Sequence, residues 1–223
     1  MNADGSPPIP WGLVMAGGES RRMGMPKADL VRGDGTTWLQ HAADLLNACC
    51  ERVWISVREH QRSTVPKGFE VIVDRYSGLG PAAGLMSAWD LFPDRPWLVL
   101  ATDMPHVTVA LLERLLRART GAAIATGFSH ADGVAEPLCT VWEPEAAELL
   151  RSAARTGKVS LSRLMAQATV NWVPLEDPGL LESVNTPSQK ARWDAEGGNP
   201  GPRSGRSRAR SAPLQEKPSK FIE

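Results

Sequence analysis

The sequence predicts an α/β fold in a single domain, with a mostly parallel central sheet and helices on both of its faces. β-rich apolar segments alternate along the chain with helical stretches of about a dozen residues, which is the pattern of strand–helix–strand units. The segment 97–101, WLVLA, is apolar throughout, as is typical of a central parallel strand. The chain has 223 residues, of which 42% are hydrophobic, enough for one sizeable core.

The elements follow in order. The apolar run 12–15 predicts the first strand. Thr37 with Gln40 three residues later predicts a capping box that opens a helix over 37–48. Pro81 stands at the start of a helix expected over 81–92, and Thr108 is expected to cap one over 109–119. Further strands are expected at 53–57, 69–73, 97–101, 122–126 and 170–173, a strand or hairpin arm at 136–142, and helices at 144–155 and 160–167.

Composition sets the expected domain bounds and excludes several classes. We expect a flexible N-terminus over 1–10, the folded domain over 11–194, and a disordered Gly/Pro/Ser/Arg-rich tail over 195–223. No apolar run approaches the ~20 residues of a membrane span, and the N-terminus lacks the features of a secretory signal. The sequence therefore predicts a cytoplasmic protein without a membrane partner.

Charged and metal-binding residue types give no sign of other partners. Lysines and arginines number 25 against 25 acidic residues, so no general nucleic-acid binding is expected. The three cysteines and four histidines have neither disulfide-framework nor zinc-site spacing. We expect the cysteines to be reduced and to act as small apolar residues.

The stretch from Leu13 to Lys27, LVMAGGESRRMGMPK, carries the main functional signal. An apolar strand opens into two glycines, whose backbone N–H groups can approach a ligand closely. Arg21, Arg22 and Lys27 then supply cations that suit phosphate groups. A Walker loop is excluded because no Gly-Lys-Ser/Thr ending follows Gly24, and a dinucleotide fingerprint is excluded by the spacing of Gly17, Gly18 and Gly24. The pattern predicts a loop that binds a nucleoside triphosphate.

Acidic residues at other strand ends point to the same place. Asp74 and Asp103 each follow an expected strand, as the glycine loop does. In Rossmann-like sheets, ligands bind beyond the carboxyl ends of the strands. We therefore expect these three features to meet at one sheet edge. Their positions alone also allow a purely structural role: Asp103 could form a turn before Thr108, and Asp74 could form the turn that ends its strand.

The glycine loop resembles the A-G-G-x-S-x-R-M-G-x-x-K signature of nucleotidyltransferases. Within that superfamily the chain is most similar to the molybdenum cofactor guanylyltransferases. Three later segments carry this narrower resemblance in the family's order: GLGPAAG at 78–84, ATDMP at 101–105, and VNTP at 184–187 followed by ARW at 191–193. Together the matches span about 11–194.

The resemblance implies transfer of GMP from GTP, with Mg²⁺, to the terminal phosphate of molybdenum-bound molybdopterin, releasing pyrophosphate. It implies molybdoenzymes or their chaperones as recipients of the product. Catalytic roles are implied for Lys27, Arg22 and Asp103, and Asp103 is the implied metal ligand, in line with the preference of Mg²⁺ for one or two carboxylates. Contacts to the nucleotide or acceptor are implied for Met15, Ala16, Gly17, Gly18, Lys27, Ser56, Asp74, Asp103 and Asn185.

Two departures from the family pattern bear on the base. Ser56 stands where the family has an asparagine, and Ala82 stands where it has a leucine. A hydroxyl offers fewer donors and acceptors than an amide, which weakens the expectation of guanine selectivity. Two alternatives stay open: a sibling transferase that uses CTP with the same pterin or a nucleotide with a sugar phosphate, and a nucleotide-binding protein that performs no transfer.

Overall fold

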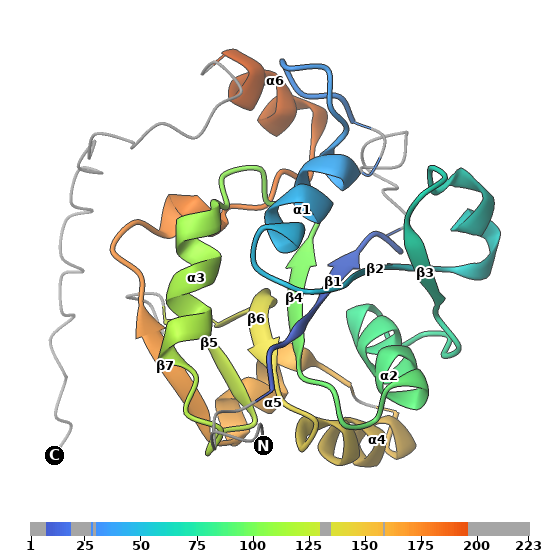
Figure 1. The fold of residues 1–223 in the computed structure, drawn as a ribbon, viewed down its shortest axis with the longest axis vertical. Coiled ribbons are helices and arrows are strands. Elements are labelled where there is room, and N and C mark those ends of the chain that lie inside the picture. Colours follow the sequence, from blue (N-terminus) through green and yellow to red (C-terminus); the bar gives the residue numbers. More distant parts are fainter. Residues whose placement is uncertain (1–7, 19–27, 29, 130–134, 158, 196–223) are drawn as a thin grey trace, which may run out of the picture.

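The computed structural model describes residues 8–18, 28, 30–129, 135–157 and 159–195 (Figure 1). In this part of the chain, seven strands form one sheet between two layers of helices, which confirms the predicted α/β class. The strands are β1 (Trp11–Met15), β2 (Val53–Val57), β3 (Glu70–Val73), β4 (Trp97–Ala101), β5 (Ala125–Ser129), β6 (Ala135–Trp142) and β7 (Val170–Pro174). The α-helices are α1 (Trp38–Asn47), α2 (Pro81–Leu91), α3 (Val109–Ala118), α4 (Ala146–Arg155), α5 (Leu161–Gln167) and α6 (Pro187–Ala195).

The sheet has the strand order β3-β2-β1-β4-β6-β5-β7. β3, β2, β1 and β4 pair in parallel, and β5 pairs in parallel with β7. β6 alone among the described strands runs antiparallel to both of its neighbours. The segment expected as a strand or hairpin arm is thus a strand near the middle of the sheet.

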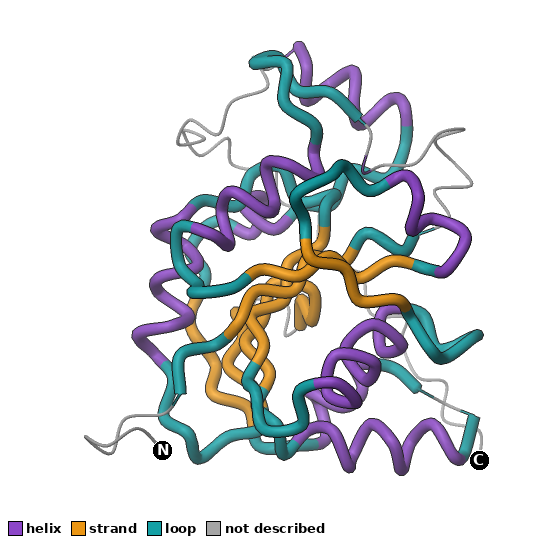
Figure 2. Tube along the Cα trace, turned by 45° about the vertical axis from the view of Figure 1, so that its right-hand side comes forward, coloured by secondary structure: helices purple, strands orange, loops and turns teal. Residues whose placement is uncertain are grey.

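Two hydrophobic cores lie on opposite faces of the sheet. Val14 belongs to the core under α1 and α3, whereas its neighbour Leu13 belongs to the core under α2, α4 and α5. This alternation follows from the two-residue period of a strand. Figure 2 shows the helices distributed around the sheet. A third, smaller cluster, here called the satellite core, consists of Leu30, Trp38, Val184 and Trp193.

Side-chain caps set several helix starts as predicted. The Thr37 hydroxyl accepts a hydrogen bond from the backbone N–H of Gln40 (3.1 Å), and Thr108 accepts one from Leu111 (3.3 Å). The expected capping box is half formed, because the Gln40 side chain donates to Asp44 (2.7 Å). These bonds satisfy N–H groups that have no partner within the helix.

The strand expected at 122–126 lies three residues later, at Ala125–Ser129, so that prediction was wrong in its bounds. The observed strand includes Gly127, a residue that weakens strand propensity. A Cβ on Gly127 would lie 2.7 Å from the Cε of Met165 in α5, so glycine permits the helix to approach the sheet. Such long-range packing leaves no local sequence signal.

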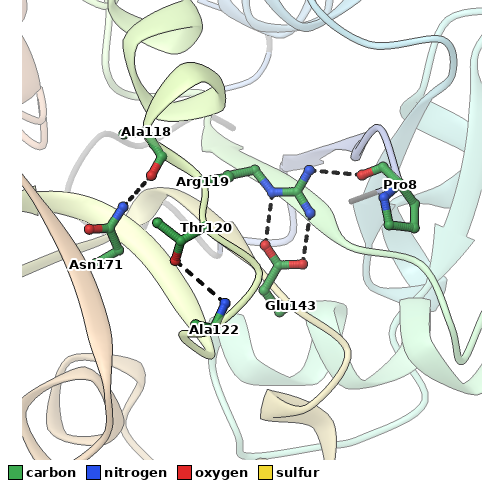
Figure 3. A network of polar contacts seen from close by, with 7 residues as sticks. All are labelled: Pro8, Ala118, Arg119, Thr120, Ala122, Glu143 and Asn171. Atoms are coloured by element: carbon green, nitrogen blue, oxygen red, sulfur yellow. Dashed lines mark hydrogen bonds and ion pairs between the residues drawn. The ribbon is translucent and has the colours of Figure 1, made fainter. Parts of the chain in front are cut away.

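A buried ion pair connects three segments of the chain at the end of the sheet where β1 begins (Figure 3). Arg119 follows α3 and donates two hydrogen bonds, each 2.8 Å, to the carboxylate of Glu143, which follows β6. Its third donor reaches the carbonyl of Pro8 (2.8 Å). The two side chains are 5% and 7% exposed. The pair therefore joins α3, β6 and residues just before β1.

Three expectations concern the termini, the cysteines and the membrane. Residues 1–7 and 196–223, which form most of the expected flexible ends, lie outside the described residues, and Ala195 ends α6.

Cys49, Cys50 and Cys139 are free thiols, and burial raises the pKa of all three. Among the described helices, none is long and apolar enough to cross a membrane.

Candidate active site

A cavity of about 340 Å³ opens beyond the carboxyl ends of β1, β2, β3 and β4. The glycine turn, Asp74 and Asp103 all line it, so the structure brings together the three features that the sequence predicted to meet. The lining residues are Met15, Ala16, Gly17, Gly18, Ser56, Arg58, Asp74, Gly80, Pro81, Ala101, Thr102, Asp103, Leu138 and Asn185. Arg22 and Lys27 lie outside the described residues.

The glycine turn continues directly from β1. The N–H of Ala16 donates to the carbonyl of Ser56 (3.0 Å), which extends the β1–β2 pairing by one residue. A Cβ on Gly17 would lie 3.0 Å from the Asp74 Oδ2 atom, so a larger residue would crowd this carboxylate. The Gly18 carbonyl accepts a hydrogen bond from the Gln61 side chain (3.3 Å). The turn is therefore packed closely against the strand-ending carboxylate.

Ser56 and Asp74 form a buried polar pair. The Ser56 hydroxyl donates to Asp74 Oδ1 over 2.7 Å, and Ser56 is only 1% exposed. Burial raises the pKa of Asp74, while the Ser56 hydrogen bond and the charge of Arg58 oppose that shift. The hydrogen of the Ser56 hydroxyl is thus donated to Asp74, whose second oxygen lies beside Gly17.

Gly84 makes this arrangement possible. It lies in α2, and a Cβ at this position would come within 2.1 Å of the Ser56 Oγ atom and 3.1 Å of the Met15 Sδ atom. The absent side chain lets α2 pack directly against the ends of β1 and β2. Gly84 belongs to the GLGPAAG segment, whose resemblance to the family pattern gave no physical reason for the glycine.

Asp103 and Asn185 come from distant parts of the chain. Asp103 follows β4, and its carbonyl accepts a hydrogen bond from the N–H of Val184 (2.8 Å). The next residue, Asn185, donates its backbone N–H to the Gln189 side chain in α6 (2.7 Å). This pair of contacts brings the C-terminal NTP segment to the nucleotide-loop side of the sheet.

Other lining residues were not expected from the sequence. Arg58 follows β2 by one residue, a position where the same strand-end argument could have found it. Leu138 lies on β6 and could be found only once β6 was known to pair with β4. Glu136, on the same strand, has a pKa raised mainly by burial and further by the negative charge of Asp103. The carboxylates of Glu136 and Asp103 are thus close enough for their charges to interact.

The described residues offer no cluster of three or more histidine, cysteine or acidic side chains that could hold a metal ion. A zinc-type site with three or four protein ligands is therefore not formed by this part of the chain. The Asp103 carboxylate suits a different kind of ion. Mg²⁺ takes one or two carboxylates and keeps several of its waters.

Comparison with known proteins agrees with the geometry. Residues 12–172 match the family described as the MobA-like NTP transferase domain. A Mycobacterium marinum protein named as a probable molybdenum cofactor guanylyltransferase is 32% identical over 182 residues, covering 78% of this chain and 88% of the relative. A Synechocystis molybdenum cofactor biosynthesis bifunctional protein is 31% identical over 179 residues, covering 79% of this chain. The matched region spans 51% of that longer relative.

Solved structures show the same fold. The crystal structure of molybdopterin-guanine dinucleotide biosynthesis protein A from Archaeoglobus fulgidus superposes with a TM-score of 0.71 and 23% identity. The match covers 83% of this chain and 97% of the archaeal one. A cytidylyltransferase from Thermus thermophilus, acting on 2-C-methyl-D-erythritol 4-phosphate, superposes with a TM-score of 0.60 and 17% identity. The fold is thus shared by transferases that are named for different bases.

Proposed function

Because this chain belongs to the MobA-like NTP transferase family, we propose that it transfers GMP from GTP to the terminal phosphate of molybdenum-bound molybdopterin and releases pyrophosphate. The observation that carries the proposal is the single cavity that joins the glycine turn, Asp74, Asp103 and Asn185. Relatives named molybdenum cofactor guanylyltransferase support the choice of nucleotide and acceptor. A cytoplasmic location belongs to the same proposal.

The reaction needs no covalent enzyme intermediate. An oxygen of the acceptor phosphate forms a bond to the α-phosphorus of GTP, and the bond from that phosphorus to the bridging oxygen of the β-phosphate breaks. Both reactants are anions, so the main barrier is the crowding of negative charge. Positioning and electrostatic stabilisation are therefore what the protein must supply.

The residues divide into a base end and a phosphate end. At the base end, Asp74 accepts hydrogen bonds from the base edge, with Ser56 holding its other oxygen. At the phosphate end, the backbone of the glycine turn approaches the phosphates, and Asn185 orients the acceptor. Lys27 and Arg22, outside the described residues, are proposed to neutralise the triphosphate.

Asp103 is the proposed ligand of a Mg²⁺ ion at the phosphate end. Its place directly after β4, in the cavity beside the glycine turn, suits an ion that also contacts the phosphates. When bound, the ion would supply positive charge against which the developing charge on pyrophosphate is stabilised. The Asp103 carboxylate would thus fix the positive charge of the ion at the phosphate end of the cavity.

Base preference tests the proposal. Guanine presents N1–H and an exocyclic amine on one edge, which a carboxylate can accept, and neither adenine nor cytosine presents this pair. A site built for such donors rejects analogues that lack them, because its own groups would stay unpaired. We expect GTP to exceed ATP and CTP by at least about tenfold in kcat/KM.

The measurement is pyrophosphate release with each triphosphate at equal concentration, Mg²⁺ and a fixed molybdopterin acceptor. Preference for CTP would instead place the chain with the cytidylyl siblings, and turnover only with a sugar phosphate would change the acceptor. Binding of GTP without any pyrophosphate release would indicate a nucleotide-binding protein that performs no transfer.

A further inference from the structure

The satellite core is small, apolar and separate from the two main cores. Its four members, Leu30, Trp38, Val184 and Trp193, are between 1% and 6% exposed. The rings of Trp38 and Trp193 pack edge to face, with centroids 5.6 Å apart and an interplanar angle of 77°. Figure 1 shows α6, which carries Trp193, beside the segment that leads into α1. The cluster thus docks the last described helix onto the first.

One member of the satellite core is bonded directly to a residue of the candidate site, and two others are bonded to each other. The Val184 N–H donates to the carbonyl of Asp103 (2.8 Å), and the next residue, Asn185, lines the cavity. The Trp38 N–H donates to the carbonyl of Leu30 (2.8 Å), and Leu30 follows Lys27 by three positions in the sequence. The cluster therefore adjoins the segment that returns beside Asp103, and in the sequence Leu30 comes shortly after the glycine loop.

The Trp193 ring contacts a member of the cluster and two cations. The guanidinium carbon of Arg32, whose side chain is 5% exposed, is 5.4 Å from the Trp193 ring centroid. The Lys190 ammonium is 5.7 Å from the same centroid and also bonds Asp194. A ring held by one aromatic partner and two cations has few alternative positions. Its removal would release α6 from α1.

Buried donors lie in and beside this cluster. The indole N–H groups of Trp38 and Trp193, and the Nη1 atom of the neighbouring Arg32, are buried without a hydrogen-bond partner among the described residues. Unpaired buried polar groups cost free energy, so these donors reduce what the cluster gains from burial. A small cluster of four residues can open locally without unfolding of the main cores.

We propose that Trp193, through its packing on Trp38 and Val184, is a positioning residue for nucleotidyl transfer. It holds Asn185 and the Asp103 turn in the arrangement that the phosphate end requires. The inference rests on the proposed function, but it concerns residues beyond position 172, where the family match ends. A misplacement of about 1 Å at a reacting centre can cost on the order of a hundredfold in rate, so loose packing here is expected to reduce turnover.

The test compares Trp193→Ala and Trp193→Phe in the full chain with Trp172→Ala as the matched control. Trp172 lies on β7, is 39% exposed and is not among the cavity residues. Four quantities are measured for each variant: deuterium uptake of the 183–187 segment, kcat and KM with GTP and the pterin acceptor, and the melting temperature.

For Trp193→Ala we expect the Val184 amide to exchange at least about tenfold faster, because the hydrogen bond to Asp103 opens more often. The kcat should fall about tenfold or more, while the KM for GTP stays within about threefold, since the base end is intact. Trp193→Phe keeps an aromatic ring and should recover part of both losses. Trp172→Ala should match the wild-type protein in exchange at 183–187, in kcat and in KM, whatever its effect on the melting temperature.

Unchanged exchange at 183–187 in Trp193→Ala would overturn the proposal, and so would faster exchange with wild-type kcat. If Trp193→Ala unfolds as a whole, the same two criteria apply to Trp193→Phe. Failure of the proposed function is distinct: wild-type protein would then show no transfer, while the exchange comparison would still decide whether Trp193 positions Val184.

Discussion

Gly84 lies in α2, where alanine would ordinarily stabilise a helix by about 1 kcal/mol relative to glycine. At this position the structure predicts the opposite effect: alanine should destabilise the protein. The new Cβ would lie 2.1 Å from Ser56 Oγ and 3.1 Å from Met15 Sδ, so either α2 or Ser56 must move. Ser56 is 1% exposed and bonded to Asp74, so it has little free space in which to rotate.

The magnitude follows from three terms. Overpacking of a tight site costs about 1–3 kcal/mol, and loss of the Ser56 hydrogen bond to a carboxylate costs about 1.5–3 kcal/mol. The helix gain offsets about 1 kcal/mol. We expect Gly84→Ala to be destabilised by about 1.5–5 kcal/mol, which lowers the melting temperature by roughly 3–20 °C.

Thermal and urea unfolding at neutral pH measure this difference. The matched control is Gly33→Ala, because a Cβ on Gly33 meets no atom within 4 Å, and its effect should stay within about 0.5 kcal/mol. Adding Ser56→Ala removes the closest contact, so the double variant should be more stable than the sum of the single effects predicts, by about 1 kcal/mol or more. A Gly84→Ala protein as stable as the wild type would refute this reasoning.

The remaining predictions concern charge. Asp103→Asn should nearly abolish transfer with an unchanged melting temperature, because the shape is kept and the metal-binding charge is lost; full activity at saturating Mg²⁺ would exclude Asp103 as the metal ligand. Arg119→Met should cost about 3–5 kcal/mol in urea unfolding, since it leaves Glu143 buried without its partner. Replacing both residues with methionine should cost less, and equal losses would show that the ion pair is not the cause. Burial lowers the pKa of His41 to about 4, assisted by the charge of Arg32. Between about pH 6.5 and 4, His41 is protonated in the unfolded chain but neutral in the folded one. The free energy of unfolding is therefore independent of the protonation of His41 above this range and decreases as the pH falls through it. In His41→Gln, stability measured across this range should fall less steeply than in the wild type, and parallel curves would contradict the assignment.

The part of the site that follows from strand ends could be predicted from sequence. A residue directly after a parallel strand lies at the ligand edge whatever the details of packing, which is why Gly17, Asp74 and Asp103 were placed correctly. Helix starts were likewise predictable where a threonine cap acts locally, as at Thr37 and Thr108.

The part that depends on contacts between distant segments could not be predicted. The β5 strand was misplaced because Gly127 lowers the local strand propensity, and its reason for being there is the close approach of Met165, which comes from a distant segment. Leu138 reached the cavity through an antiparallel pairing that periodicity does not encode. The commitment of the Ser56 hydroxyl to Asp74 depends on a glycine 28 positions later in the sequence, at Gly84.

Transfer of the α-phosphate group is the central claim, and GTP labelled separately at its α- and γ-phosphorus tests it most directly. With Mg²⁺ and the molybdopterin acceptor, we predict that the α-label appears in the pterin product and the γ-label in pyrophosphate, in equal amounts. Recovery of the γ-label as orthophosphate, with no α-label on the acceptor, would show hydrolysis in place of transfer and would contradict the account.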